Sequence, residues 1–184
     1  RAVIFDLYGT LLEVGPPPAN AALRWTSTWQ AALGTAPRLS LAQFDDACRA
    51  VVAVEHATAR TRGIAFPEVY WPAIVDQVLP EFAGLPAALR LASPVYRHDF
   101  RHTARLMPGV VDALRAAQKA PLRMGLASNC QPYSLRELDD ALAGTGLGRG
   151  LFHPRLSFLS FEHGFSKPDP HVFRLLTTRL RTFG

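Results

Sequence analysis

The sequence lacks the features that mark disulfide-rich or membrane-embedded proteins. Its 184 residues include only two cysteines, Cys48 and Cys130, which lie too far apart to form a metal-binding or redox motif. We therefore expect no disulfide framework, and a reducing, cytoplasmic setting is the simplest interpretation. No apolar run is long enough to span a bilayer, so a membrane is not an expected partner.

Lysine is also scarce. Lys119 and Lys167 are the only lysines among 20 basic residues, and the rest are arginines. The formal net charge is +5 at pH 7, but the arginines are scattered and form no dense basic run interleaved with aromatic side chains. Nucleic acid is therefore not an expected partner. The positive charge favours a small anionic substrate instead.

The pattern of predicted elements is a strand, a long helical block, and then alternating helices and strands. Residues 2–7 form an apolar run typical of a buried parallel strand. Residues 19–106 show helical periodicity without a strand pattern, and strands return at 122–127 and 156–159. This order predicts an α/β fold that is split by an all-helical insertion.

Within the helical block, two local signals are specific enough to predict helix starts. Ser40 can cap a helix that runs from Leu41 towards Arg60. A further helix is predicted to begin at residues 66–68, because apolar side chains recur at every fourth position after it. The sequence therefore predicts helix, not extended chain, in the middle of this block.

Three motifs indicate where the chemistry lies. Asp6 ends the first apolar run, AVIF, and is followed by Gly9 and Thr10. A charge at the carboxyl end of a buried strand lies at the rim of the sheet, where open α/β folds place their ligands. The second motif is residues 122–129, LRMGLASN, and the third is residues 164–173, GFSKPDPHVF.

These motifs, in this order, resemble motifs I, II and III of the haloacid dehalogenase (HAD) superfamily. The resemblance implies that Asp6 is a nucleophile forming a covalent aspartyl intermediate, and that Lys167 orients it and offsets substrate charge. Ser128 would bind an anionic group of the substrate. Tyr8, Thr10 and Asn129 are the further residues expected near substrate.

The resemblance also implies a fold class and a domain organisation. We expect a Rossmann-like HAD core, with a three-layer arrangement around a parallel sheet, formed by residues 1–15 and 107–184. Residues 16–106 would be an inserted all-helical cap. Members of the superfamily carry a fourth motif, a strand ending in acidic residues, which should follow residue 184. The sequence is therefore expected to be a core truncated before that motif.

Tyr8 separates the expected activities. Phosphatase members have an acid two residues after the nucleophile, which protonates the leaving alcohol, whereas a phenol is a weak acid at neutral pH. Tyr8 resembles the L-2-haloacid dehalogenases, whose halide leaving group needs no proton and which use no metal.

Phe173 is a departure from those enzymes, which have a tyrosine at this position. One alternative is therefore a phosphatase of a small organic phosphate, in which Asp6 and the Tyr8 carbonyl would hold Mg²⁺. A second alternative is a non-catalytic HAD-like binding module. A homodimer is compatible with each of the three.

Overall fold

A computed structural model describes residues 1–182. Contacts divide the chain into two compact units. The first contains residues 1–14, 64–68 and 104–182 of the described chain, and the second contains residues 15–63 and 69–103. Each unit is described below by itself.

The first unit is built on a parallel three-stranded sheet. Its strands are β1 (Ala2–Phe5), β4 (Arg123–Ser128) and β5 (Phe158–Leu159), in the order β1-β4-β5. Phe5 pairs with Leu126, and β4 is buried from its second residue to its last. A central strand covered on both faces explains why this segment is apolar without alternation.

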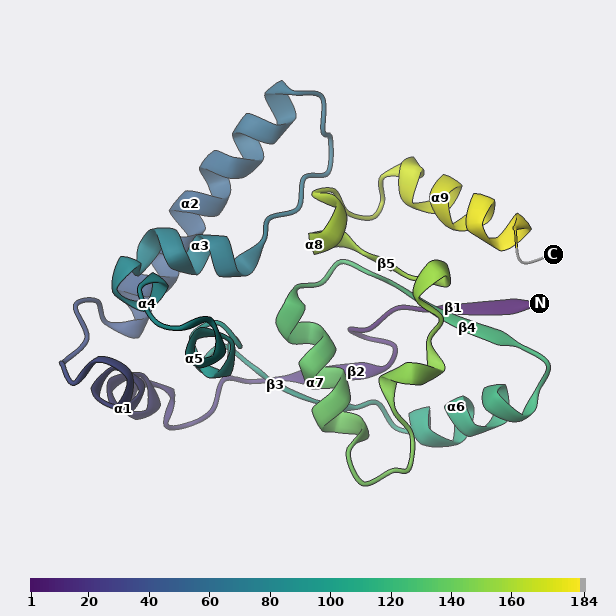
Figure 1. Ribbon diagram of the computed structural model, residues 1–184, viewed down its shortest axis with the longest axis horizontal. Coiled ribbons are helices and arrows are strands. Elements are labelled where there is room, and N and C mark those ends of the chain that lie inside the picture. The colour runs from purple at the N-terminus through teal and green to yellow at the C-terminus, as the bar shows by residue number, and fades with distance from the viewer. Residues whose placement is uncertain (183–184) are drawn as a thin grey trace. The chain divides into compact units, whose positions relative to one another are not determined.

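Helices cover both faces of this sheet. Alternate residues of β4 face opposite sides, so Leu126 and Ala127 belong to two separate hydrophobic clusters. One cluster contains side chains of α6 (Val110–Lys119) and α7 (Pro132–Leu142), and the other contains side chains of α9 (Pro170–Arg181). Figure 1 shows α9 on one side of β1 and β4 and the other two helices opposite. The expected three-layer α/β core is confirmed.

Close approach of two main chains explains one residue of β4. A Cβ atom at Gly125 would lie 2.1 Å from the carbonyl oxygen of Leu156, which is a backbone atom and cannot move aside. Leu156 belongs to a short 3₁₀ turn, Pro154–Leu156, immediately before β5. Glycine is therefore required where this turn crosses the central strand.

The remaining elements of the first unit include one that the sequence did not predict. The α8 helix (Ser160–His163) follows β5 directly. A 3₁₀ turn, Arg149–Leu151, lies before β5 in the chain. A second, two-stranded sheet joins β2 (Leu12–Gly15) to β3 (Thr103–Leu106). The expectation that residues 19–106 contain no strand is wrong, because β3 is short and gains its partner from a segment about 90 residues earlier in the chain.

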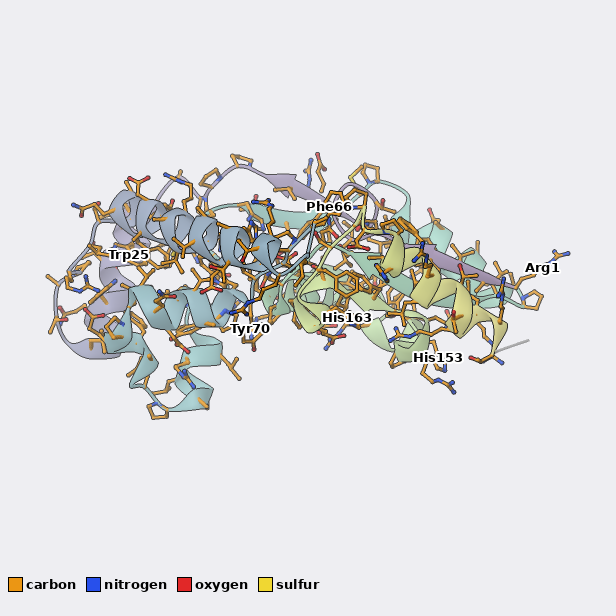
Figure 2. All side chains as sticks on the ribbon, turned by 90° about the horizontal axis from the view of Figure 1, so that it is seen from above. Arg1, Trp25, Phe66, Tyr70, His153 and His163 are labelled. Carbon is orange, nitrogen blue, oxygen red and sulfur yellow. The ribbon has the colours of Figure 1, made fainter. Side chains whose placement is uncertain are left out.

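The second unit is helical. It contains α1 (Ala21–Leu33), α2 (Leu41–Thr61), α3 (Trp71–Val78), α4 (Pro80–Ala83) and α5 (Ala87–Ala92). Aromatic side chains form its interior, where Trp25 (labelled in Figure 2) stacks on Phe44 with ring centroids 4.9 Å apart. Ser40 forms the expected cap with Gln43 at the start of α2. No helix within residues 1–182 has the length and apolar character needed to cross a membrane.

The boundary between the units differs from the expected one. Residues 64–68 interrupt the second unit and belong to the first, so residues 16–106 are not a single insertion. The helix predicted to begin at 66–68 begins at Trp71 instead. The main chain before α3 is extended because its N–H and C=O groups bond with Gly164 and Ser166. In a helix these groups would be used within the helix itself.

Candidate active site

The first site residue, Asp6, immediately follows the end of β1. Its Oδ1 accepts a hydrogen bond of 2.8 Å from the main-chain N–H of Leu7, which fixes one carboxylate oxygen. The chain then turns sharply, and Gly9 adopts a left-handed conformation with φ of 75°. The N–H groups of Thr10, Leu11 and Leu12 all point to the carbonyl of Leu7.

Lys167 reaches this carboxylate from the loop before α9. Its Nζ donates to Asp6 Oδ2 at 2.6 Å and to the carbonyl of Ala127 at 2.7 Å. The Asp6 side chain nevertheless keeps 39% of its surface exposed, and that of Lys167 keeps 22%. The pair therefore combines a charge-assisted hydrogen bond with a carboxylate that a small molecule can approach.

The side chain of Asn129 is engaged with Lys167. Its Oδ1 accepts from the main-chain N–H of Lys167 at 2.7 Å, and its Nδ2 donates to the carbonyl of Lys167 at 2.9 Å. Asn129 was expected near substrate. In the structure its amide holds the loop that carries Lys167, and its contact with substrate stays a prediction.

Ser128 ends β4, one strand over from Asp6. It is 1% exposed, and its Oγ has no hydrogen-bond partner in the described part of the chain, although it is near enough to the Cys130 thiol to lower that group's pKa. A buried hydroxyl without a full partner is uncommon and costs free energy. This orphaned group at the rim of the sheet matches the expected contact with an anionic group of a substrate.

The Tyr8 side chain reaches α7. Its hydroxyl lies 2.6 Å from Glu137 Oε2 and 2.8 Å from Ser134 Oγ. Burial raises the pKa of Tyr8 far above its ordinary value, and the charge of Glu137 raises it further. The Tyr8 hydroxyl thus binds a carboxylate of α7, and the expected contact of Tyr8 with substrate stays a prediction.

Thr10 occupies an exposed position in the turn after Asp6. Its main-chain N–H donates to Leu7 at 3.3 Å, which supports the turn. The structure gives Thr10 no role beyond this main-chain bond, so its expected contact with substrate stays a prediction.

Three polar residues that the sequence did not mark are hydrogen-bonded to one another next to the second motif. Glu68, Gln131 and Ser160 lie in the same unit, and the Glu68 carboxylate accepts from both of the others. Glu68 comes from the segment predicted to be helical, so no local pattern marked it. Only Gln131 carried a signal, since it directly precedes Pro132 at the start of a helix.

Comparison with protein families decides the identity. The profile described as "Hydrolase: haloacid dehalogenase-like hydrolase" matches residues 1–182. The chain belongs to the haloacid dehalogenase-like hydrolases. No curated protein sequence is significantly similar to it.

Solved structures of HAD-like proteins resemble this chain at low identity. A structure described as a dehalogenase is 16% identical, with 98% of this chain and 71% of that chain covered and a TM-score of 0.45. The HAD-hydrolase YfnB from Bacillus subtilis, bound to magnesium, is 19% identical over 100% and 74% of the two chains, with a TM-score of 0.45. The L-2-haloacid dehalogenase from Xanthobacter autotrophicus, with chloropropionic acid covalently bound, is 20% identical over 98% and 64%, also at 0.45.

The side chains around Asp6 bear on whether this site can hold a divalent cation. Oxygen ligands from several carboxylates are what Mg²⁺ requires of a protein. Across residues 1–182, no group of three or more His, Cys, Asp or Glu side chains is placed to hold a metal ion. Asp6 is the one carboxylate shown at the site, and its Oδ2 binds Lys167. The described residues do not by themselves supply the several carboxylates that a magnesium site requires.

Proposed function

We propose that this protein is a hydrolase that acts on a small anionic substrate through a covalent intermediate on Asp6. Within that class, we propose carbon–halogen hydrolysis of a 2-halocarboxylate.

The observation that carries the choice of bond is the position of Tyr8. In a phosphatase of this superfamily, the residue two positions after the nucleophile is an acid that protonates the leaving alcohol. Here that position holds a phenol whose pKa is raised by burial and whose hydroxyl binds Glu137. Such a group does not donate a proton at neutral pH, and a halide leaving group needs none.

The reaction then proceeds in two displacements. A carboxylate oxygen of Asp6 attacks the carbon that bears the halogen; the carbon–oxygen bond forms, and the halide leaves with the electron pair of the carbon–halogen bond. Water next attacks the carbonyl carbon of the resulting aspartyl ester. The ester breaks to release a 2-hydroxycarboxylate and to restore Asp6.

Two neighbouring groups suit the carboxylate of the substrate. The Lys167 ammonium supplies positive charge beside the nucleophile, and it keeps that nucleophile ionised and oriented. The Ser128 hydroxyl is buried at the end of the adjacent strand and lacks a full partner. A substrate carboxylate would supply the acceptor that this hydroxyl lacks.

The test is halide release from both enantiomers of 2-chloropropionate, with added Mg²⁺ and with a chelator. Hydrolysis of p-nitrophenyl phosphate is followed in parallel as the phosphatase readout. A single turnover in H₂¹⁸O, followed by mass spectrometry of the peptide containing Asp6, detects the aspartyl ester, because water attacks the carbonyl carbon of that ester. We expect halide release, and label in Asp6.

Asp6→Asn provides the decisive variant, and Asp112→Asn is its control because Asp112 is exposed on α6 in the same unit. We expect the first to abolish turnover and the second to leave it unchanged. Magnesium-dependent phosphate release without halide release would favour the phosphatase alternative. No turnover on either substrate class would favour the non-catalytic binding module.

A further inference from the structure

A segment from the middle of the chain pairs with the loop that carries Lys167. The N–H of Glu68 donates to the carbonyl of Gly164 at 3.0 Å, and the N–H of Ser166 donates to the carbonyl of Phe66 at 2.8 Å. Pro67 lies between these bonds and forms an antiparallel bridge with Phe165. Figure 2 labels Phe66 on this segment and His163 just before the loop.

The side chain of Glu68 extends this pairing to the turn after the second motif. Its Oε1 accepts from Gln131 Nε2 at 3.0 Å, and its Oε2 accepts from Ser160 Oγ at 2.7 Å. Gln131 is 8% exposed and Ser160 is fully buried. A carboxylate that accepts from two buried donors forms strong, charge-assisted hydrogen bonds.

The partners of Glu68 lie one bond away from the active-site residues. Ser160 Oγ also accepts from the N–H of Cys130 at 2.9 Å, so Glu68 and the second-motif turn share one hydroxyl. Cys130 follows Asn129, whose amide holds the main chain of Lys167. The segment that contains Glu68 thus binds both parts of the site. Its main chain binds the lysine loop, and the Glu68 side chain binds the second-motif turn through Gln131 and Ser160.

The network also reaches the first motif. The main-chain N–H of Gln131 donates to Ser134 Oγ at 3.0 Å, and that hydroxyl lies 2.8 Å from the Tyr8 hydroxyl. One set of hydrogen bonds therefore connects segments of all three motifs. Glu68 is the member that comes from the middle of the chain, far in sequence from all three motifs.

We propose that Glu68 is a positioning residue for the hydrolase reaction. It fixes the 128–131 turn relative to the 164–167 loop, and so fixes Lys167 against Asp6. This inference rests on the proposed function, in which Lys167 orients the nucleophile. Glu68 acts through Ser160, Gln131 and the main chain.

Removing the carboxylate would take an acceptor away from two buried donors, and Ser160 Oγ would keep the carbonyl of Cys130 at 3.2 Å. Buried polar groups that lose a partner shift to improve their remaining bonds, and here one of them, Gln131, lies in the turn that bears Asn129. Rates at such sites are sensitive to displacements of about 1 Å. The expected consequence is a lower kcat, because the reacting groups are misaligned.

The main test exchanges the carboxylate of Glu68 and the amide of Gln131 between the two positions. In Glu68→Gln, the new amide still accepts from Ser160, but its –NH₂ group faces that of Gln131, so two donors meet. Adding Gln131→Glu restores a donor and an acceptor with reversed direction. We expect kcat of the single variant to fall about tenfold or more, and the double variant to recover most of that loss.

A second readout does not depend on turnover. The side-chain amide resonances of Asn129 and the main-chain amide resonance of Lys167 report whether their two hydrogen bonds persist. We expect both sets of resonances to shift in Glu68→Gln and to return in the double variant. Glu162→Gln is the matched control, because Glu162 is exposed on α8 in the same unit.

The outcomes separate this inference from the proposed function. Unchanged kcat and unchanged resonances in Glu68→Gln would overturn the positioning role while leaving the hydrolase intact. A loss of kcat that the double variant does not recover would also overturn it. If the wild-type protein turns over no substrate, the proposed function fails, and the resonances alone then decide whether Glu68 positions the turn and the loop.

Discussion

Asp6 and Lys167 are 161 positions apart in the sequence, yet Lys167 Nζ lies 2.6 Å from Asp6 Oδ2. The ammonium is held in place by a second acceptor, the carbonyl of Ala127 at the neighbouring strand end. These two acceptors fix the position of the positive charge beside Asp6, the proposed nucleophile. Preorganised charge of this kind is a large contribution to catalysis.

Lys167→Met should therefore lower kcat by about 10²–10³-fold, as the loss of a preorganised charged donor does in other active sites. The measurement is steady-state turnover of the best substrate found. Lys119→Met is the matched control, since Lys119 is the only other lysine and lies exposed at the end of α6. Equal rates in the two variants would exclude an electrostatic role for Lys167.

Asn129→Asp tests the amide that holds Lys167. An aspartate keeps the acceptor for the N–H of Lys167 but replaces the donor to its carbonyl with a second oxygen, so two acceptors meet. We expect kcat to fall by about tenfold to a hundredfold, which corresponds to the roughly 1–3 kcal/mol cost of an unmet group. Asn20→Asp, at an exposed helix start whose side chain caps nothing, is the control. A larger effect on KM than on kcat would instead indicate that Asn129 contacts substrate.

Tyr8→Phe should affect stability more than catalysis. The change removes the hydroxyl bound to Glu137 and Ser134, and we expect a loss of about 1–3 kcal/mol in the free energy of unfolding. Because the phenol is not the proton donor of the reaction, kcat should be unchanged once the variant is folded. Denaturant unfolding and turnover at saturating substrate measure the two effects. A large fall in kcat in a fully folded variant would show that the hydroxyl takes part in the chemistry.

The raised pKa of Tyr8 adds a dependence on pH. The folded state favours the protonated phenol, so this stabilisation is complete below the ordinary pKa of about 10 and is lost as pH rises above it. Tyr8→Phe should therefore lose less stability than the wild type between neutral and strongly alkaline pH.

The two thiols should give a further alkaline transition. Burial raises the pKa of Cys48 and of Cys130 from 9.0 to about 12. The folded state thus favours the protonated thiols, and their contribution is complete below pH 9 and is lost between pH 9 and about 12, at about 1.4 kcal/mol per pH unit for each thiol. The variant Cys48→Ala/Cys130→Ala should show a shallower loss of unfolding free energy across this window. Equal slopes would show that the thiols ionise as readily in the folded state as in the unfolded one.

Local rules predicted the elements that depend on neighbours in sequence. Ser40 caps α2 as expected, because its partner Gln43 is three residues away. The strand at 122–127 is found as β4, since a segment buried on both faces must be apolar throughout. The positions of Asp6 and Ser128 followed from the same reasoning, because parallel strands end at one edge of a sheet.

Pairing between distant segments could not be predicted in this way. Residues 66–68 carry no strand pattern, and they are extended because their partners, Gly164 and Ser166, lie about 100 positions later. The direction of Tyr8 depends likewise on Glu137, which is 129 positions away. Side chains such as Glu68 and Asn129 have their roles from these pairings, so the sequence indicated which motifs matter but not how they are held together.

The chain passes between its two units after Val14, Gly63, Glu68 and Thr103. A chimera made by exchanging residues 16–106 for the insertion of a relative would discard the segment that pairs with Gly164 and Ser166, along with the carboxylate bound to Ser160. Grafting in two pieces, 15–63 and 69–103, keeps that segment with its own core. The geometry around Asp6 is then inherited intact.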